Sequence, residues 1–253
     1  MDLHQSSATL YNKDRTTLRT NIVHAVLDHS EALNNHTITF WFNPEEKLRF
    51  EPGQYVELSV PHSNVDNRGV TRWMSLSSTP AEPLLGVTTA FPAKSSSYKQ
   101  ALHALQPGDA VQFGSVLGDF ILPKDRRLPL IFIVGGIGAA PVRSMIAWLK
   151  SQGEQRHIEL LYSAGTRDEL IFNDLFSSYV TRYTPSLTKS TPDWTGQTGR
   201  LTSSRVMSWI SDHNNDALTY LSGPQGLIEP LFNELIVAGI PRAQLVLDYF
   251  PGY

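Results

Sequence analysis

The residues whose types and spacing point most directly to chemistry are three glycines and a proline in the stretch VGGIGAAP. Gly135, Gly136 and Gly138 follow an apolar run, and Pro141 stands where a helix is expected to begin. Glycine lets the backbone turn sharply and lets a ligand approach the amides, while a helix N-terminus offers N–H groups to a phosphate. Proline fits a first helical turn, where its missing N–H costs nothing. The pattern predicts a pyrophosphate-binding turn, and the alternative is a strand–helix turn without a ligand.

A second turn of the same kind is SGPQG, which places Gly223 and Pro224 between an apolar run and a helical pattern. In a parallel sheet both turns would lie at the carboxyl edge, where ligands bind. Between them the segment YSAGTRDEL follows another apolar run. An acidic residue there would suit NAD, whereas an arginine suits a 2′-phosphate. Arg167 therefore favours NADPH, unless it only pairs with a carboxylate at the surface.

These turns need a parallel sheet to position them, and the second half of the chain has the pattern of one. Continuous apolar runs alternate with helical patterns, which predicts buried strands covered by helices on both faces. The strands are expected at 130–134, 158–163, 179–185, 218–223 and 244–250, and the helices near 141–151, 168–178, 202–212 and 226–238.

The first half of the chain consists of short alternating segments separated by turn residues, which is typical of a small antiparallel barrel or sandwich. We expect strands at 37–42, 54–60, 72–77 and 84–91, and a short helix at 97–105. The predicted fold class is therefore an antiparallel β-barrel followed by an α/β parallel-sheet domain. We expect an N-terminal arm over residues 1–19, the barrel over 20–124 and the α/β domain over 125–253.

The composition excludes several classes of function. The 253 residues are 41% hydrophobic and 18% charged with a net charge of −3, so nucleic acid is not an expected partner. Cysteine is absent, which excludes disulfides, thiolate zinc sites and cysteine-held iron–sulfur clusters within this sequence. The eight histidines lack the spacing of metal ligands. Without a membrane-length apolar run or an apolar signal core, we expect a cytoplasmic protein without a membrane span.

Several motifs follow one another in a recognisable order. They are RWMS (72–75), SSSYKQAL, GSVLGDFILP, GGIGAAP, SAGTRDELIF, LSGPQG and the terminal YFPGY. In this order and spacing they resemble the ferredoxin–NADP reductase superfamily of flavin oxidoreductases. The resemblance implies that the barrel holds FAD and that the α/β domain holds NADP(H) or NAD(H).

The resemblance implies roles for four consecutive residues of the barrel. Arg72 resembles the arginine that binds the flavin pyrophosphate, where a planar guanidinium suits a phosphate anion. Ser75 resembles the serine near the reactive N5 of the flavin, and Trp73 and Met74 lie beside it in the cofactor-binding motif. Met74 stands where the family usually has an aromatic residue. Strand alternation predicts that Trp73 points to the other face.

Three serines and the end of the chain complete the site that the resemblance implies. Ser95, Ser96 and Ser97 resemble the turn that holds the flavin phosphates, although its usual glycine is missing; one of them is also a candidate helix N-cap. Ser222 stands where many relatives have a cysteine near the nicotinamide, and Asp248 resembles an acidic residue near the flavin edge. Tyr253 resembles a terminal aromatic that stacks on the flavin and gates the nicotinamide, so the C-terminal tail would return to the flavin.

We therefore expect an FAD-dependent NAD(P)H oxidoreductase that passes hydride from the nicotinamide to FAD and electrons to a separate acceptor. The resemblance implies a ferredoxin, flavodoxin, haem protein or oxygenase as that acceptor. Three alternatives stay open. They are a reductase of small acceptors such as free flavin or ferric iron, a flavin-holding adaptor or redox sensor in a larger complex, and a nucleotide-binding scaffold without flavin.

Overall fold

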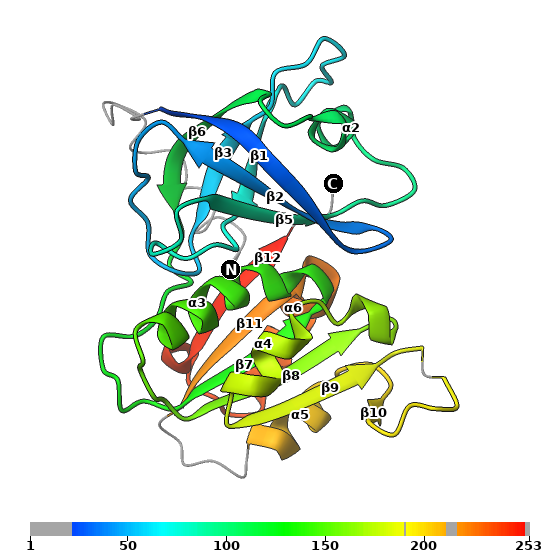
Figure 1. Ribbon diagram of the computed structural model, residues 1–253. Helices are drawn as coiled ribbons and strands as arrows, with labels where there is room; N and C mark the ends of the chain where they lie inside the picture. Colours follow the sequence, from blue (N-terminus) through cyan, green and yellow to red (C-terminus); the bar gives the residue numbers. More distant parts are fainter. Residues whose placement is uncertain (1–21, 190, 211–216, 251–253) are drawn as a thin grey trace, which may run out of the picture.

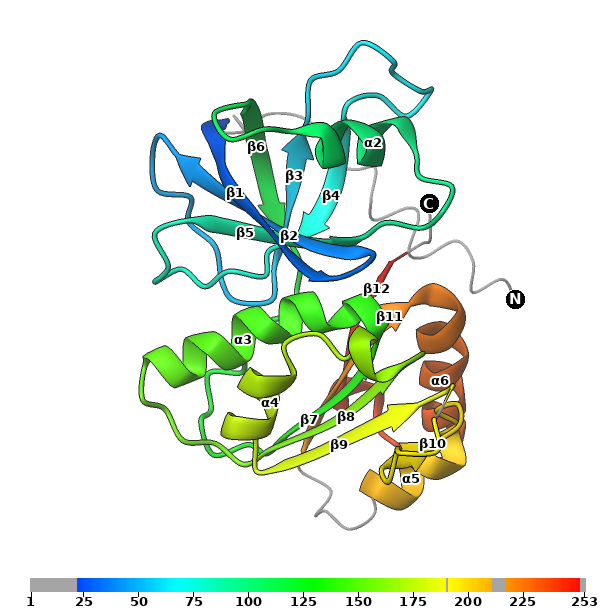
Figure 2. The same cartoon turned by 45° about the vertical axis from the view of Figure 1, so that its right-hand side comes forward.

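Two six-stranded sheets organise the chain in the computed structural model, which describes residues 22–189, 191–210 and 217–250. In Figures 1 and 2, the first sheet and one helix form the upper part of the molecule, and the second sheet with its covering helices forms the lower part. The predicted arm at residues 1–19 and the terminal Tyr253 lie outside the described residues. Within the described ranges, no helix combines the length and apolar character that crossing a membrane requires.

The first sheet is antiparallel throughout, in the order β4-β3-β6-β1-β2-β5. Its strands are β1 (Val23–Asn34), β2 (Thr37–Pro44), β3 (Tyr55–Ser59), β4 (Thr71–Ser75), β5 (Leu85–Ala90) and β6 (Ala110–Leu117). The edge strands approach each other through a single bridge between Leu76 and Val87, so the sheet curls into a barrel-like shape without a closed ladder. The helix α2 (Ser97–Ala104) follows β5, as the sequence predicts.

The interior of this sheet is filled by residues that alternate along the strands. On β1, Val23, Ala25 and Leu27 are buried while their neighbours are exposed, as expected when successive side chains point to opposite faces. Phe42 packs edge-to-face on Phe113, with ring centroids 5.4 Å apart. Burial of such side chains contributes about 1.5–3 kcal/mol each, which makes this cluster the main stabilising element of the barrel half.

The second sheet is parallel throughout, in the order β10-β9-β8-β7-β11-β12. Its strands are β7 (Leu130–Gly135), β8 (Ile158–Ala164), β9 (Arg182–Leu187), β10 (Gln197–Thr198), β11 (Leu218–Pro224) and β12 (Leu245–Phe250). The helices α3 (Ala139–Ser151) and α4 (Asn173–Tyr179) lie on one face, and α5 (Ser203–Ile210) and α6 (Gln225–Val237) on the other (Figure 1). Short 3-10 turns η2 (Gly136–Gly138), η3 (Arg167–Glu169) and η4 (Arg242–Gln244) complete it.

Burial on both faces explains why the strands of this sheet are continuously apolar. On β7, Phe132 and Val134 join the cluster under α3 and α4, whereas Ile131 and Ile133 join the cluster under α5 and α6. Every residue of β7 is buried. A strand in this position cannot show the polar alternation of a half-exposed strand.

The structure confirms the predicted fold class and most elements, with three differences. The sequence analysis missed strands β1 and β6 and the two-residue strand β10. The strand expected at 179–185 begins at Arg182, because α4 continues to Tyr179. The helix expected at 168–178 is interrupted at Phe172, whose φ of 59° is left-handed. Leu170 and Ile171, which precede the interruption, are buried in the core under α3 and α4.

Two glycines of the first turn are required for different physical reasons. A Cβ on Gly138 would lie 2.3 Å from the carbonyl oxygen of Ser222, so the turn packs directly on the backbone of β11. Gly136 has a φ of 49° and nothing within 4 Å of an added Cβ, so only its conformation calls for glycine. The constraint at Gly138 is packing, and the constraint at Gly136 is backbone conformation.

We therefore predict that Gly138→Ala destabilises the fold more than Gly136→Ala. Gly138→Ala must push two backbone segments apart, at a cost of about 3 kcal/mol, whereas Gly136→Ala costs about 1–2 kcal/mol for a left-handed alanine. Guanidinium unfolding followed by circular dichroism measures both. Equal midpoints, or the reverse order, would contradict the packing argument.

Candidate functional site

The two glycine turns predicted from the sequence lie side by side at the carboxyl edge of the parallel sheet. Strand β7 ends at Gly135 and pairs with β11, which ends at Pro224. The turns also interlock, because a Cβ on Gly135 would lie 2.5 Å from the Leu227 side chain at the start of α6. Pro141 is buried in the first turn of α3, where its missing N–H is tolerated, as predicted.

The first turn is also tied to the neighbouring strand β8. The Tyr162 hydroxyl donates to the carbonyl oxygens of Gly136 at 3.0 Å and of Glu169 at 3.1 Å. Burial raises the pKa of Tyr162 well above its usual value, so this hydroxyl stays a donor at every physiological pH. Tyr162 therefore fixes the turn against β8, while no neighbouring atom lies within 4 Å of a Cβ added to Gly136.

A cavity of about 410 Å³ opens at the same edge, between the ends of β8 and β9 and the first turns of α5 and α6. Four hydroxyl groups and one guanidinium group contribute to its wall. The lining residues are Ser163, Thr188, Arg200, Leu201, Thr202, Ser203, Gly226, Leu227, Pro230, Leu231 and Glu234. The size and the mixture of apolar and hydroxyl groups suit a small organic ligand.

The cavity includes residues that the sequence analysis did not single out. Ser163 is the last residue of a predicted strand and Thr188 follows another, so their position at the carboxyl edge was the available signal. Arg200 lies in the short connection between β10 and α5. Arg167 is not among the lining residues: its guanidinium lies 3.5 Å from the Asp193 carboxylate and 5.3 Å from the Trp194 ring centroid, on the surface.

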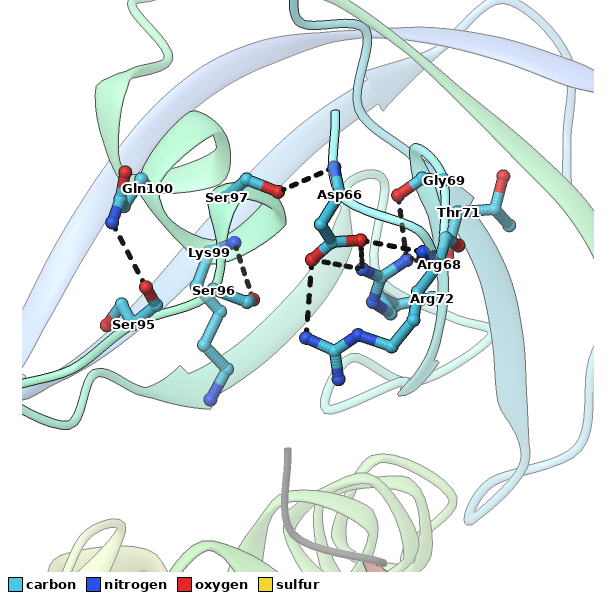
Figure 3. Close-up of polar contacts among 10 residues, drawn as sticks. All are labelled: Asp66, Arg68, Gly69, Thr71, Arg72, Ser95, Ser96, Ser97, Lys99 and Gln100. Carbon is cyan, nitrogen blue, oxygen red and sulfur yellow. Dashed lines mark hydrogen bonds and ion pairs between the residues drawn. The ribbon is translucent and has the colours of Figure 1, made fainter. Parts of the chain in front are cut away.

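In the barrel half, Arg72 is held by the loop between β3 and β4 (Figure 3). Its side chain is almost fully buried. Nη1 donates to the carbonyl oxygens of Arg68 and Gly69 at 2.9 Å and of Thr71 at 2.7 Å, and Nη2 donates to the Asp66 carboxylate at 3.0 Å. The guanidinium therefore has a fixed orientation and an anionic partner.

Asp66 joins this arginine to the N-terminus of α2. Its carboxylate also accepts from Arg68, and its backbone N–H donates to the Ser97 hydroxyl at 3.3 Å (Figure 3). The backbone hydrogen bond from Arg68 and the contacts with Arg72 lower the pKa of Asp66. Donors and positive charge thus converge on a carboxylate here, which is the chemistry that also suits a phosphate.

The three predicted serines have different roles in the structure. Ser96 is the N-cap of α2, accepting from the Lys99 N–H at 3.3 Å, so the N-cap hypothesis is confirmed for this residue. Ser95 donates to the Pro92 carbonyl, and Ser97 accepts from Asp66. In Figure 3, Ser97 adjoins Asp66, the partner of Arg72, whereas Ser95 lies farther away beside Gln100. Their contact with flavin phosphates stays a prediction.

Strand alternation separates the remaining residues of the RWMS motif. Met74 packs against the barrel core, opposite Val56 in the strand pairing. Trp73 faces the other way, and its ring lies edge-on to Tyr55 with centroids 5.2 Å apart, as the alternation predicts. Ser75 is buried at the end of β4. Met74 therefore serves the hydrophobic core at the position where the family usually has an aromatic residue.

Ser222 and Asp248 form a polar pair at the ends of β11 and β12. The two residues face each other in the parallel register, and the fully buried Ser222 hydroxyl lies 3.4 Å from an Asp248 carboxylate oxygen. Burial raises the pKa of Asp248 to about 7, while the Ser222 hydrogen bond opposes this rise. A carboxyl group with this pKa can carry or release a proton near neutral pH.

A family model described as the oxidoreductase NAD-binding domain matches residues 132–231, the segment that holds both glycine turns. Among curated proteins, the chain is 31% identical over 182 residues to a component of the Na(+)-translocating NADH-quinone reductase of Yersinia pestis (strain Pestoides F). The match covers 68% of this chain and 44% of the relative, so the chain spans less than half the length of that relative.

Two further comparisons cover almost the whole chain. The reductase component DmpP of phenol 2-monooxygenase from Pseudomonas sp. (strain CF600) is 27% identical over 241 residues, which are 90% of this chain and 64% of DmpP. The Amycolatopsis cytochrome P450 reductase GcoB superposes with a TM-score of 0.77 at 22% identity, covering 93% of this chain and 72% of GcoB.

A ferredoxin NADP+ reductase from Neisseria gonorrhoeae, solved with bound FAD and NADP, superposes with a TM-score of 0.75 at 18% identity. The superposition covers 90% of this chain and 98% of that reductase. At these identities the two structural likenesses show the shared fold.

The Asp248 carboxyl predicts a pH dependence of stability. The folded protein holds this proton up to about pH 7, whereas an ordinary aspartate releases it near 3.8. Ionisation inside the fold is therefore unfavourable, and stability falls as the pH rises through this window. Asp248→Asn cannot ionise, so its free energy of unfolding does not show this fall. Between about pH 5 and about pH 8, the difference in free energy of unfolding should shift by about 2 kcal/mol in favour of Asp248→Asn over the parent protein.

Thermal unfolding of both proteins across that range measures the difference. Exposed Asp174→Asn is the control and should show no such trend. A constant offset between Asp248→Asn and the parent protein at every pH would contradict the burial argument.

Proposed function

The chain belongs to the ferredoxin–NADP reductase-like family of FAD- and NAD(P)-binding oxidoreductases, and from this premise we propose that it oxidises NAD(P)H through FAD and reduces a separate acceptor. The observation that carries the proposal is the open Gly136 turn beside the cavity of about 410 Å³ at the carboxyl edge. A second anion-binding cluster, around Arg72, lies in the other sheet. Two such sites suit two nucleotide cofactors.

When bound, the two cofactors would supply the redox chemistry, which is hydride transfer from a nicotinamide to FAD and electron release to an acceptor. The chain's own task is to hold both groups in one orientation and to exclude water between them. We propose that the segment 20–124 holds FAD and the segment 125–253 holds the nicotinamide nucleotide.

For FAD, we propose that Arg72 and the α2 N-terminus bind the pyrophosphate. The donor set fits the group, since Arg72 and Arg68 already donate to the Asp66 carboxylate. A phosphate would share or replace that carboxylate, and the serine turn 95–97 adds hydroxyl and amide groups. Ser75 at the end of β4 is proposed to contact the flavin ring, in line with the family resemblance.

For the nicotinamide nucleotide, we propose that the Gly136 turn and the first turn of α3 bind the pyrophosphate. The cavity then takes the adenosine end, with Ser163, Thr188 and Thr202 offering hydroxyl groups. Ser222 and Asp248 are proposed to lie at the nicotinamide end, where Asp248 can hold a proton at neutral pH. Tyr253 is proposed to gate this end.

For the acceptor, the names of the relatives support a partner protein. DmpP is the reductase component of a monooxygenase, and GcoB is a cytochrome P450 reductase. Because the sequence has no cysteine, a cysteine-held iron–sulfur carrier must be supplied by another chain or segment. We propose an oxygenase or haem protein as the electron acceptor, and the cytoplasm, where NAD(P)H is regenerated, as the place of the reaction.

The visible spectrum of the purified protein tests the proposed function. We expect a flavin absorption band that bleaches when NADPH or NADH is added without oxygen. Arg72→Ala should lose about 1.5–3 kcal/mol of charged hydrogen bonding, and so bind FAD about 10–100-fold more weakly. A protein without a flavin band after incubation with FAD would overturn the proposal in favour of a nucleotide-binding scaffold.

Arg200 and Arg167 make the choice of nicotinamide testable. We propose that Arg200, which lines the cavity without an ion pair to any described residue, binds a 2′-phosphate, while Arg167 is already engaged by Asp193. Arg200→Ala should then raise the KM for NADPH about 10-fold or more with little change for NADH.

Arg167→Ala is the matched control and should leave both constants nearly unchanged. If Arg167→Ala instead raised the KM for NADPH but not for NADH, Arg167 would be the residue that binds the 2′-phosphate. Equal effects of Arg200→Ala on both nucleotides would mean that the cavity does not distinguish them.

A further inference from the structure

The helix α3 connects the glycine turn of the parallel sheet to the first sheet. It begins directly after η2 and runs between the two sheets, next to β5 (Figures 1 and 2). Its second turn carries Arg143 and Ser144, which contact the segment 77–82 on the other side. This segment begins two residues after Ser75. One helix thus contacts both parts of the proposed site.

Arg143 holds this segment through three hydrogen bonds. Nη1 donates to the Ser77 carbonyl at 2.8 Å and to one Glu82 carboxylate oxygen at 2.7 Å, and Nη2 donates to the other oxygen at 2.8 Å. The guanidinium also lies 5.3 Å from the Trp41 ring centroid. A bidentate pair restricts orientation as well as distance, unlike a single contact.

Two further contacts make the arrangement rigid. The buried Ser144 hydroxyl donates to the Ser78 carbonyl at 2.5 Å, and Glu82 accepts from the Thr79 N–H at 2.6 Å. Burial raises the pKa of Glu82, but the hydrogen bond and charge of Arg143 outweigh it and hold the net pKa below its usual value. The carboxylate therefore remains ionised and paired at neutral pH. We call these five residues, Ser77, Ser78, Glu82, Arg143 and Ser144, the α3 bridge.

The α3 bridge connects the backbone next to Ser75 with the helix that follows the glycine turn. On one side it holds the backbone that leaves Ser75, and on the other it belongs to the helix whose N-terminus follows Gly138. We propose that Arg143 and Glu82 are positioning residues, which fix the flavin-binding strand relative to the nucleotide-binding turn and so align the two reacting rings. The inference rests on the proposed function. Misplacement by about 1 Å can slow a reaction by about 100-fold, so such a bridge has a kinetic consequence.

Glu82→Gln and Arg143→Lys test this without removing a cofactor-binding side chain. Lysine keeps the positive charge but lacks the planar fork that binds both carboxylate oxygens, so Arg143→Lys is the milder variant. In single-turnover measurements, we expect flavin reduction by NADPH to slow by about 10-fold or more. The bound flavin per chain and the dissociation constant for NADP+ should change by less than about twofold, since the bridge does not contact either proposed pyrophosphate site.

A second measurement needs no cofactor. Because the natural sequence has no cysteine, spin labels attach only to cysteines introduced at exposed Lys47 and Asp174, one on each side of the bridge. Double electron–electron resonance should show a broader distribution of distances in Glu82→Gln than in its parent. The matched control is Glu154→Gln, which removes the partner of the buried Arg156 within the second half of the chain and should leave the distribution narrow.

The outcomes separate the two hypotheses. Unchanged distances and an unchanged rate in Glu82→Gln would overturn the positioning role, as would equal broadening in Glu154→Gln. A broadened distribution in a protein that never binds flavin would support the bridge as an orienting device and contradict the proposed function alone.

Discussion

The site depends on one close contact between backbone segments. Gly138 lies against Ser222 and Gly223 so closely that no side chain fits between them. This contact fixes the start of α3 on the end of β11, and with it the relation between both glycine turns. The turn is also held by Tyr162, whose hydroxyl donates to the Gly136 carbonyl, while the position of a Cβ on Gly136 is free of neighbouring atoms. A turn fixed in this way keeps one conformation, which is what the proposed pre-organised anion binding requires.

Helix α3 extends this local constraint to the whole molecule. Its N-terminus belongs to the glycine turn, its apolar face is buried on the parallel sheet, and its Arg143 and Ser144 hold the first sheet. A helix packed on all these sides cannot rotate without breaking buried contacts. The two halves of the chain are thus linked through a rigid element rather than through the connecting segment alone.

In the barrel half, the positive charge belongs to a side chain, Arg72, which already has an anionic partner. Arg72 is immobilised by four acceptors of one loop, and Asp66 already neutralises it. This arrangement orients the guanidinium before any ligand arrives, but a phosphate must then compete with or share the carboxylate. In the parallel-sheet half, by contrast, the proposed anion-binding groups are the backbone amides of the Gly136 turn, and within the described part of the chain no carboxylate is hydrogen-bonded to Gly136. The two nucleotide sites would therefore respond differently to ionic strength.

The sequence by its local patterns predicted the two-part fold class, the glycine turns and an N-cap among the serines 95–97, because these depend on apolar periodicity, glycine spacing and helix capping; the structure identified Ser96 as the cap. It also predicted the opposite orientations of Trp73 and Met74, since strand alternation is local. The tertiary structure alone decided which arginine lines the cavity, why Gly138 must be glycine, and that Asp66 and Glu82 partner Arg72 and Arg143. Those relations join residues on different elements, up to 84 positions apart for Gly138 and Ser222. Such contacts depend on how elements pack, which no local sequence pattern specifies.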